Sequence, residues 1–323
     1  MDHRIMRTRT LLALTSSGLL WGTTVPLSKV ALADWGPAWL TVARFTLAAL
    51  PLAWIGRRHL RRALTPGVAG WGVAGYGVVI VLQNAGIERT SVSHAALLIG
   101  AMPVLVALLT VGLGRGRVGP VAWLGFAVAL GGIAVISVDG VGAASLAGDA
   151  LVLVSLLFAA AFMVAQPRLL AGRDPVAVTA VQLAAAALGT LPVAVAVDGV
   201  PTAAPGAAPM AAMVGLAVGG TLVPFTLFAW AQARISPEVA GAFLNLEPLV
   251  GVVLGVAAFG DPLGVPQVVG GAAILAGIGL NAVPLGGRRT GPAAAGPAVT
   301  NPAAGSTAGS TAGPRELTGA GVG

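Results

Sequence analysis

Long apolar stretches, separated by short breaks rich in proline, glycine or charge, dominate the chain. A helix needs about 20 apolar residues to cross the roughly 30 Å of hydrocarbon in a bilayer. Ten stretches meet or approach that length: 11–32, 37–55, 67–86, 91–112, 119–138, 148–166, 175–197, 208–231, 237–258 and 265–285. Apolar and polar positions do not alternate along them with a period of two, which favours helices over barrel strands. The pattern predicts an all-α polytopic membrane protein with ten transmembrane helices.

The two ends of the chain follow a different pattern. The first ten residues are polar and basic, and after Arg288 and Arg289 the chain consists mainly of Ala, Gly, Pro, Ser and Thr. Such a composition offers too little apolar surface to build a core. We expect residues 1–10 to form a short cytoplasmic N-terminus and residues 286–323 to form a disordered cytoplasmic tail.

Composition agrees with a membrane protein and removes several classes of site. Charged residues make up 9% of the chain and hydrophobic residues 56%, whereas a soluble domain carries about 25% charged residues. There is no cysteine, and the three histidines, His3, His59 and His94, lack the spacing of a metal site. Neither a metal nor a cofactor is therefore expected.

The positions of the basic residues predict the orientation. With the N-terminus in the cytoplasm, fifteen of the eighteen Lys and Arg residues fall in cytoplasmic loops or termini, and Arg89 alone falls outside. The other two, Lys29 and Arg44, lie within predicted helices. Because basic residues stay in the cytoplasm, both termini are expected there. Basic loops that face anionic lipid also explain the pI near 11.5, so no nucleic-acid partner is expected.

The chain also resembles itself. An offset of 145 residues places Pro103 on Pro248, Gly119 on Gly264, Gly125 on Gly270, Gly132 on Gly277 and Ile133 on Ile278 without a gap. Further upstream LTVARFTLAALPLA resembles VTAVQLAAAALGTLPVA, with Arg44 opposite Gln182. The halves 11–138 and 148–285 then hold five helices each, and an odd number forces them into opposite orientations. Two inverted five-helix repeats, with a substrate site between them near the midplane, are predicted.

Several segments resemble a known family. These are WGTTVPLSKVAL at 21–32, ARFTLAALPLA at 43–53, ARISPEVAGAFLNLEPLVGVVLGVAAFGDPLG at 233–264 and GGAAILAGIGL at 270–280. They are similar to the drug/metabolite transporter superfamily in its EamA-like ten-helix branch, and Leu-Glu-Pro at 246–248 is the most specific match. The resemblance implies an inner-membrane transporter, usually an exporter of amino acids, small metabolites or drugs. Arg115 and Arg117 depart from it, because the family usually has an acidic residue soon after helix 4.

Charged residues inside the predicted helices are costly and point to function or to pairing. Glu247 is the only acid well inside a predicted helix, and its repeat partner is Met102. Its carboxylate either couples transport to protons, or it is structural and bonded to Arg44 or to backbone freed by Pro248. Arg44 either binds an anionic substrate group or neutralises Glu247, and the second alternative is favoured. Lys29, near the outer end of helix 1, is expected to snorkel, with a substrate role as the alternative.

Other candidates could line a substrate pathway. Trp21, Tyr76, Phe158, Phe162 and Phe225 fall in the middle parts of helices 1, 3, 6 and 8. Core packing is the alternative for each, and Trp21 and Tyr76 rank first, because an indole at mid-membrane is unusual and a buried hydroxyl needs a partner. His94 could shuttle protons or face an outer vestibule, and the vestibule is favoured. Asn245 lies two residues from Glu247, on a different helical face, which limits their sharing one ligand.

The leading hypothesis is a secondary active transporter in the cytoplasmic membrane that exports a small organic solute, with proton entry through Glu247. A gradient-driven facilitator, an uptake permease and a non-transporting membrane scaffold are the alternatives. An enzyme is not expected, because no nucleophile–base pair or metal cluster occurs. The expected partners are a small-molecule substrate, the lipid bilayer and, in the leading hypothesis, protons. Sequence leaves a homodimer and a monomer equally open.

Overall fold

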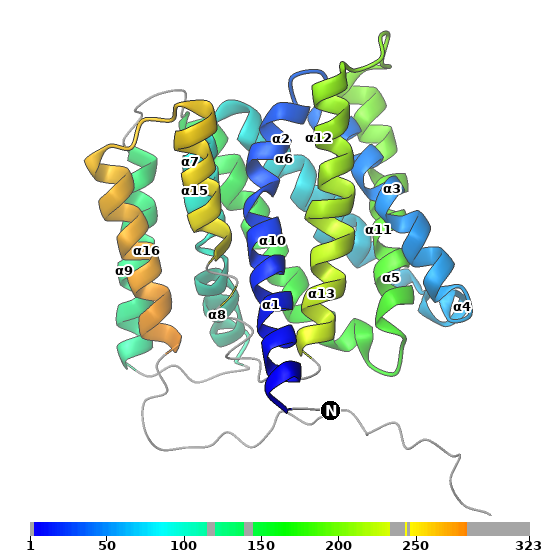
Figure 1. The fold of residues 1–323 in the computed structure, drawn as a ribbon, viewed down its shortest axis with the longest axis horizontal. Helices are drawn as coiled ribbons and strands as arrows, with labels where there is room; N and C mark the ends of the chain where they lie inside the picture. Colours follow the sequence, from blue (N-terminus) through cyan, green and yellow to red (C-terminus); the bar gives the residue numbers. More distant parts are fainter. Residues whose placement is uncertain (1–2, 115–119, 139–144, 233–242, 244–245, 283–323) are drawn as a thin grey trace, which may run out of the picture. The chain divides into compact units, whose positions relative to one another are not determined.

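The computed structural model describes residues 3–114, 120–138, 145–232, 243 and 246–282 (Figure 1). Helices account for almost all of these residues, and no strand occurs among them. The first half contains α1 (His3–Gly22), α2 (Thr24–Ala31), α3 (Pro37–Gly56), α4 (Leu60–Ala63), α5 (Pro66–Gly72), η1 (Val73–Val78), α6 (Val79–Arg89), α7 (Val92–Ile99), α8 (Met102–Gly112) and α9 (Pro120–Val138). The second half contains α10 (Leu146–Leu170), α11 (Pro175–Val193), η2 (Ala194–Asp198), α12 (Ala207–Ala217), η3 (Val218–Leu222), α13 (Val223–Gln232), α15 (Leu246–Phe259) and α16 (Val265–Ala282). The expected tail lies outside the described residues.

Five helices are long and apolar enough to cross a membrane by length and composition. They are Pro37–Gly56, Pro66–Arg89, Leu146–Leu170, Pro175–Asp198 and Ala207–Phe228. Shorter apolar helices cover Val92–Val106, Trp123–Val135, Leu246–Phe259 and Val265–Gly277. The chain is therefore a multi-pass all-helical membrane protein, while the count of ten spans stays a prediction.

Two predicted helices are interrupted where a proline follows. The stretch predicted at 11–32 is split between α1 and α2 at Thr23, and the stretch at 91–112 is split between α7 and α8 after Ile99. A proline has no N–H for the carbonyl four residues earlier. Pro26 and Pro103 therefore leave the carbonyls of Gly22 and Ile99 without their usual donors, which matches the positions of the two breaks.

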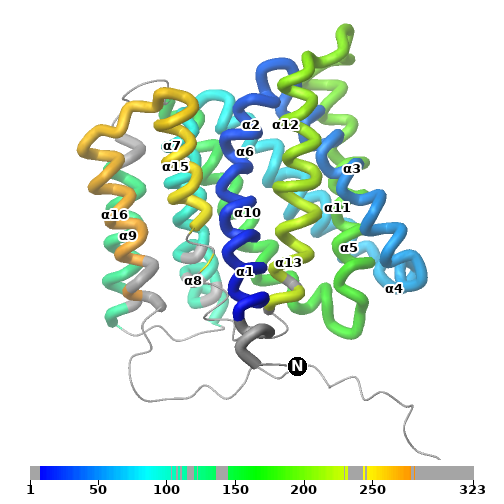
Figure 2. The backbone as a smooth tube through the Cα atoms, viewed as in Figure 1, coloured from blue at the N-terminus to red at the C-terminus, as the bar shows by residue number. Residues whose placement is uncertain are grey.

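The helices of the two halves pack against one another in pairs. The most extensive contacts join α9 with α16, α3 with α11, α6 with α10, α7 with α15, and α1 with α13. Figures 1 and 2 show α9 and α16 side by side at one edge of the bundle, and α7 beside α15 next to them. Each of these pairs takes one helix from each half, so the two halves interlock along their length.

Glycines set the close approach of α9 and α16. A Cβ atom built on Gly132 would come within 3.0 Å of the Gly270 carbonyl oxygen, and one built on Gly277 would do the same at the Gly125 carbonyl. The offset of 145 residues relates Gly125 to Gly270 and Gly132 to Gly277. Exchanging the two halves therefore turns the Gly132–Gly270 contact into the Gly277–Gly125 contact. A twofold axis between α9 and α16 requires this relation.

Candidate functional site

A cavity of about 560 Å³ lies among helices of both halves. Its volume falls in the range of small-molecule sites, about 300–1,000 Å³. Most of the lining is apolar. The polar side chains in it are Thr24, Ser28, Arg44, Tyr76, Gln83, Thr221 and Glu247. The cavity thus offers an apolar chamber with a small number of placed polar groups, the arrangement typical of a solute site.

Arg44 is held by the π-helical turn η3. The side chain is buried, its Nε donates to Thr221 Oγ1 at 2.9 Å, and its Nη2 donates to the Gly220 carbonyl at 3.3 Å. Thr221 Oγ1 in turn donates to the Leu216 carbonyl at 3.0 Å. Pro224 has no N–H for the Gly220 carbonyl four residues earlier, so this acceptor is open to the guanidinium. The π-helical turn η3 therefore fixes an arginine that α3 supplies.

The favoured pairing of Arg44 with Glu247 is not what the structure contains. Among the described residues, ion pairs within 4.0 Å are Arg89 with Glu88 and His94 with Asp149. Arg44 and Glu247 both line the cavity without an ion pair between them. Nε and Nη2 of the guanidinium instead donate to Thr221 Oγ1 and to the Gly220 carbonyl. None of the described residues donates a hydrogen bond to the carboxylate of Glu247, which is the second residue of α15 and precedes Pro248.

Four of the five aromatic candidates meet at the cavity. Trp21, Tyr76, Phe162 and Phe225 line it, with ring centroids 4.9 Å apart for Tyr76–Phe162, 6.3 Å for Tyr76–Phe225 and 5.4 Å for Trp21–Phe225. All three pairs meet edge to face, the favourable geometry for aromatic rings. Phe158 lies outside the lining and is 44% exposed. Residues of α1, η1, α10 and α13 thus build one continuous aromatic wall.

His94 is buried rather than open to a vestibule, which corrects the expectation. It is 2% exposed and lies outside the cavity lining. Its Nδ1 lies 3.4 Å from Asp149 Oδ2, and its Nε2 lies 3.1 Å from Gln267 Nε2. Because the Gln267 amide nitrogen can only donate, His94 Nε2 accepts and Nδ1 carries the proton toward Asp149. Thr90 Oγ1 donates to the other oxygen of Asp149 at 2.6 Å.

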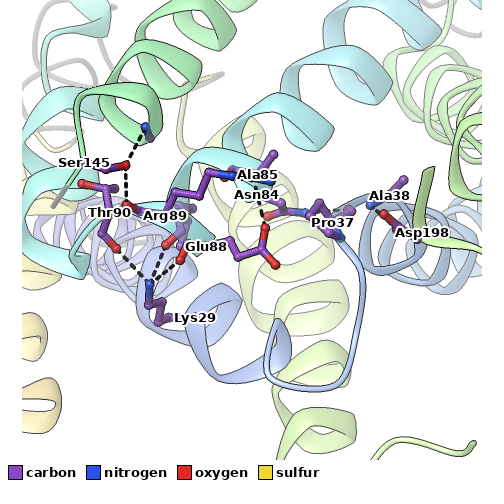
Figure 3. Close-up of polar contacts among 12 residues, drawn as sticks. Lys29, Pro37, Ala38, Asn84, Ala85, Glu88, Arg89, Thr90, Ser145 and Asp198 are labelled. Carbon is purple, nitrogen blue, oxygen red and sulfur yellow. Dashed lines mark hydrogen bonds and ion pairs between the residues drawn. The ribbon is translucent and has the colours of Figure 1, made fainter. Parts of the chain in front are cut away.

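Lys29 caps a helix instead of snorkelling or meeting the cavity. Its Nζ donates to the carbonyls of Ile87, Glu88 and Thr90 at 2.8, 3.0 and 2.9 Å (Figure 3). These carbonyls lie at and just after the C-terminus of α6, where the helix has no partners of its own and attracts positive charge. Lys29 thereby ties α2 to the end of α6. Asn245, the remaining candidate, lies outside the described residues.

The π-helical turns supply four cavity residues, of which only Tyr76 was predicted from the sequence. Gly75 and Tyr76 belong to η1, Gly220 and Thr221 belong to η3, and all four line the cavity. The offset of 145 residues that relates the halves places Tyr76 on Thr221. Applying that offset to Tyr76 would have found Thr221. A π-helical turn inside an α-helix is frequent at functional sites, because it shifts the side chains that follow it.

Comparisons with known proteins agree with this architecture. The model of the EamA-like transporter family matches residues 8–138 and again residues 146–283. A probable terminal-alkyne amino-acid exporter of Streptantibioticus cattleyicolor is 30% identical over 283 residues, which cover 86% of this chain and 95% of that protein. An uncharacterized transporter of Synechocystis is 29% identical over 136 residues, 39% of each chain. A protein crystal structure with a TM-score of 0.60 and 22% identity covers 85% of this chain and 96% of its own, which supports the fold alone.

Proposed function

The chain belongs to the EamA-like transporter family, and we propose that it is a secondary active transporter that exports small organic solutes across the cytoplasmic membrane. Amino acids, metabolites and drugs are the candidate solutes. The observation that carries the proposal is the cavity of about 560 Å³, which both halves line and into which Arg44 and Glu247 face without pairing. The relative named as an amino-acid exporter supports the direction and the class of solute.

The separated charges suit a zwitterionic solute such as an amino acid. The Arg44 guanidinium is fixed by Thr221 on one side, and a guanidinium with free N–H groups binds a carboxylate well. The Glu247 carboxylate, with no donor among the described residues, offers the complementary charge to an ammonium group. The aromatic wall of Trp21, Tyr76, Phe162 and Phe225 would contact an apolar side chain.

The repeat registers support a site between two inverted five-helix repeats. The family model matches the chain once in each half, and the glycine contacts of α9 and α16 are reciprocal. Repeat partners also line the same cavity: Trp21 with Ala159 and Thr24 with Phe162 at an offset of 138, and Ile80 with Phe225 and Met102 with Glu247 at an offset of 145. Two halves related by inverted repeats can exchange conformations, which gives two states of the protein that open to opposite sides of the membrane. The distribution of basic residues supports a cytoplasmic position for both termini.

The symmetry of the cavity is broken by its charges. Arg44 falls opposite Gln182 and Glu247 falls opposite Met102 in the repeat. Each half therefore contributes one charge of a different sign. A solute with two unlike charged groups would bind in one orientation in such a cavity, and proton exchange at Glu247 would release the group held there.

Export is tested by comparing the extracellular metabolites of cells that express the protein with those of cells that lack its gene. The purified protein is then reconstituted in proteoliposomes, and the flux of the solute found is measured under a pH gradient. Glu247→Gln is expected to abolish flux driven by the pH gradient. Glu88→Gln is the matched control, because Glu88 is exposed and pairs with Arg89 at 3.2 Å outside the cavity.

Each outcome separates the hypotheses. Unchanged flux in Glu247→Gln would contradict proton coupling through this residue. Counterflow that is independent of pH in the unmodified protein would favour a gradient-driven facilitator. Absence of any flux with every solute that accumulates would contradict the transport proposal itself.

A further inference from the structure

A second depression lies outside the cavity, along α5 and the start of η1. It has a volume of about 310 Å³ and is lined by Pro66, Gly67, Gly70, Trp71 and Ala74. These five residues recur every three to four positions, so they share one face of the helix. We call this surface the α5 groove. At a rise of 1.5 Å per residue it runs about 12 Å along the helix axis.

The groove exists because side chains are missing on that face. A Cβ atom built on Gly70 would meet nothing within 4 Å, and one built on Gly67 would meet only Leu169 Cδ2 at 4.0 Å. Trp71 lines the groove and also packs on Phe162 with ring centroids 6.3 Å apart. All the lining residues lack charge. A narrow apolar groove on the outside of a membrane helix faces lipid chains, not a water-soluble ligand.

Exposed arginines come shortly before this groove in the chain. Arg57, Arg58, Arg61 and Arg62, which we call the arginine cluster, are all exposed; the first two directly follow α3, and the other two belong to the short helix α4. Arg62 precedes Pro66 by four residues, so their Cα atoms lie within about 15 Å. Figure 1 shows α4 at the rim of the bundle, at the end of α3. The exposed Arg168 immediately precedes Leu169, whose Cδ2 would lie 4.0 Å from a Cβ built on Gly67.

No acidic group neutralises the cluster among the residues that the structure describes. None of its arginines is in an ion pair there. The acid that starts the neighbouring helix, Asp174, accepts a hydrogen bond from the Ala177 N–H at 2.8 Å and so caps α11. Arg57 lies over the Trp54 ring, 4.5 Å from its centroid, which holds its charge at the surface. The surface therefore combines a concentrated positive charge with an apolar groove.

The packing beneath keeps this surface in place. Ala63 of α4 and Val68 of α5 belong to a buried cluster with Ala177, Val178 and Val181 of α11. The Thr65 hydroxyl accepts a hydrogen bond from the Val68 N–H at 3.3 Å and caps α5. The groove and the arginine cluster are thus presented by one rigid corner of the bundle.

We propose that the α5 groove and the arginine cluster form a binding site for one anionic phospholipid. An acyl chain lies in the groove, and the phosphate receives hydrogen bonds from the arginines, whose planar guanidinium groups match phosphate oxygens. Under the proposed orientation the site faces the inner leaflet, where basic residues attract anionic lipid. The site is separate from the transport cavity, so its test does not depend on the proposed transport function.

The experiment is native mass spectrometry of the full chain in detergent with added phosphatidylglycerol or phosphatidylcholine. The unmodified protein is expected to bind phosphatidylglycerol more tightly. The double variant Arg61→Gln/Arg62→Gln is expected to lose about 25-fold in affinity for phosphatidylglycerol, at about fivefold for each arginine. The control pair Arg7→Gln/Arg9→Gln removes the same charge from the N-terminal end and is expected to have little effect.

The groove is tested with a second variant. Gly70→Leu fills the open space and is expected to weaken phosphatidylglycerol binding roughly fivefold, because the leucine side chain occupies the volume that the acyl chain would fill. The matched control is Gly131→Leu, an exposed helical glycine of α9 with nothing within 4 Å of its built Cβ. Both variants are expected to fold, since leucine favours helix over glycine.

Three results would overturn the proposal. Equal affinities for phosphatidylglycerol and phosphatidylcholine would show that the arginine cluster does not select an anionic lipid. If Arg61→Gln/Arg62→Gln loses affinity for phosphatidylglycerol and Gly70→Leu does not, then no acyl chain lies in the groove. Concentration-dependent dimers that disappear in Gly70→Leu would assign the surface to a second copy of the chain.

Discussion

Replacing Thr221 by valine tests the hydrogen bonds that orient Arg44 in the cavity. Valine has nearly the shape of threonine, so the variant removes the hydroxyl without opening a cavity. Two hydrogen bonds go with it: Arg44 Nε loses its acceptor at 2.9 Å, and the Leu216 carbonyl loses its donor at 3.0 Å. Thr221 is 2% exposed and Arg44 is 6% exposed, so water cannot easily replace the lost partner.

The expected cost follows from the charge of the donor. A hydrogen bond to a charged group contributes about 1.5–3 kcal/mol, and a neutral one contributes about 1 kcal/mol. The Gly220 carbonyl remains as a partner of Arg44 at 3.3 Å and limits the loss. We expect Thr221→Val to lower the free energy of unfolding by about 2–3 kcal/mol. Thr221→Ser keeps the hydroxyl and should cost about 1 kcal/mol or less.

Thermal unfolding of the detergent-purified variants measures this difference. A double-mutant cycle with Arg44→Met isolates the coupling, because Thr221→Val should cost much less once the guanidinium is absent. Transport then gives a second readout: a less constrained Arg44 should raise the Michaelis constant for a carboxylate-bearing solute more than it lowers the maximal rate. Equal stabilities of Thr221→Val and Thr221→Ser, with no coupling to Arg44, would refute the reasoning.

Three further predictions concern the packing and the polar contacts outside the cavity. Gly277→Ala should destabilise the protein by about 1–3 kcal/mol in thermal unfolding, because the new Cβ would overlap the Gly125 carbonyl. Gly131→Ala is the control: a Cβ at position 131 meets open space, so the stability should stay equal or rise. Asp149→Asn should cost about 1–3 kcal/mol, since an amide cannot accept hydrogen bonds with both of its terminal atoms as the carboxylate does from Thr90 and His94; unchanged stability would contradict that network. Lys29→Met should speed amide hydrogen exchange at the C-terminus of α6, because three carbonyls lose their donor, and exchange equal to that of the unmodified protein would show that this cap has no effect.

Several helices could be predicted closely from the sequence. The stretches predicted at 37–55 and 175–197 correspond to helices at Pro37–Gly56 and Pro175–Asp198. Each begins with a proline, which fits the first turn of a helix because the N–H there has no partner in any case. A segment that must be apolar to lie in lipid and that starts at such a residue can be placed without knowledge of its neighbours.

The candidate site could be predicted only in part. Trp21 and Tyr76 are the aromatic residues that the sequence ranks first for a substrate pathway, and both line the cavity. His94 and Phe158 were also plausible from depth alone, yet one is buried against Asp149 and the other is exposed at the surface. Lipid chains and neighbouring helices are equally apolar, so hydropathy gives the depth of a residue but not the side of the helix that faces the cavity.

Hydropathy and motifs were enough to identify a helical membrane protein of the EamA-like family, and they predicted the internal repeat and which charged residues lie within helices. The groups that those charges contact could be found only in the folded chain. Arg44 contacts Thr221 across 177 residues of chain, and not Glu247. Lys29 binds carbonyls that lie 58 to 61 residues away. Such contacts depend on how far each helix is rotated and how closely it approaches its neighbours. Glycines at close crossings and π-helical turns set both, and no local pattern of apolar residues specifies them.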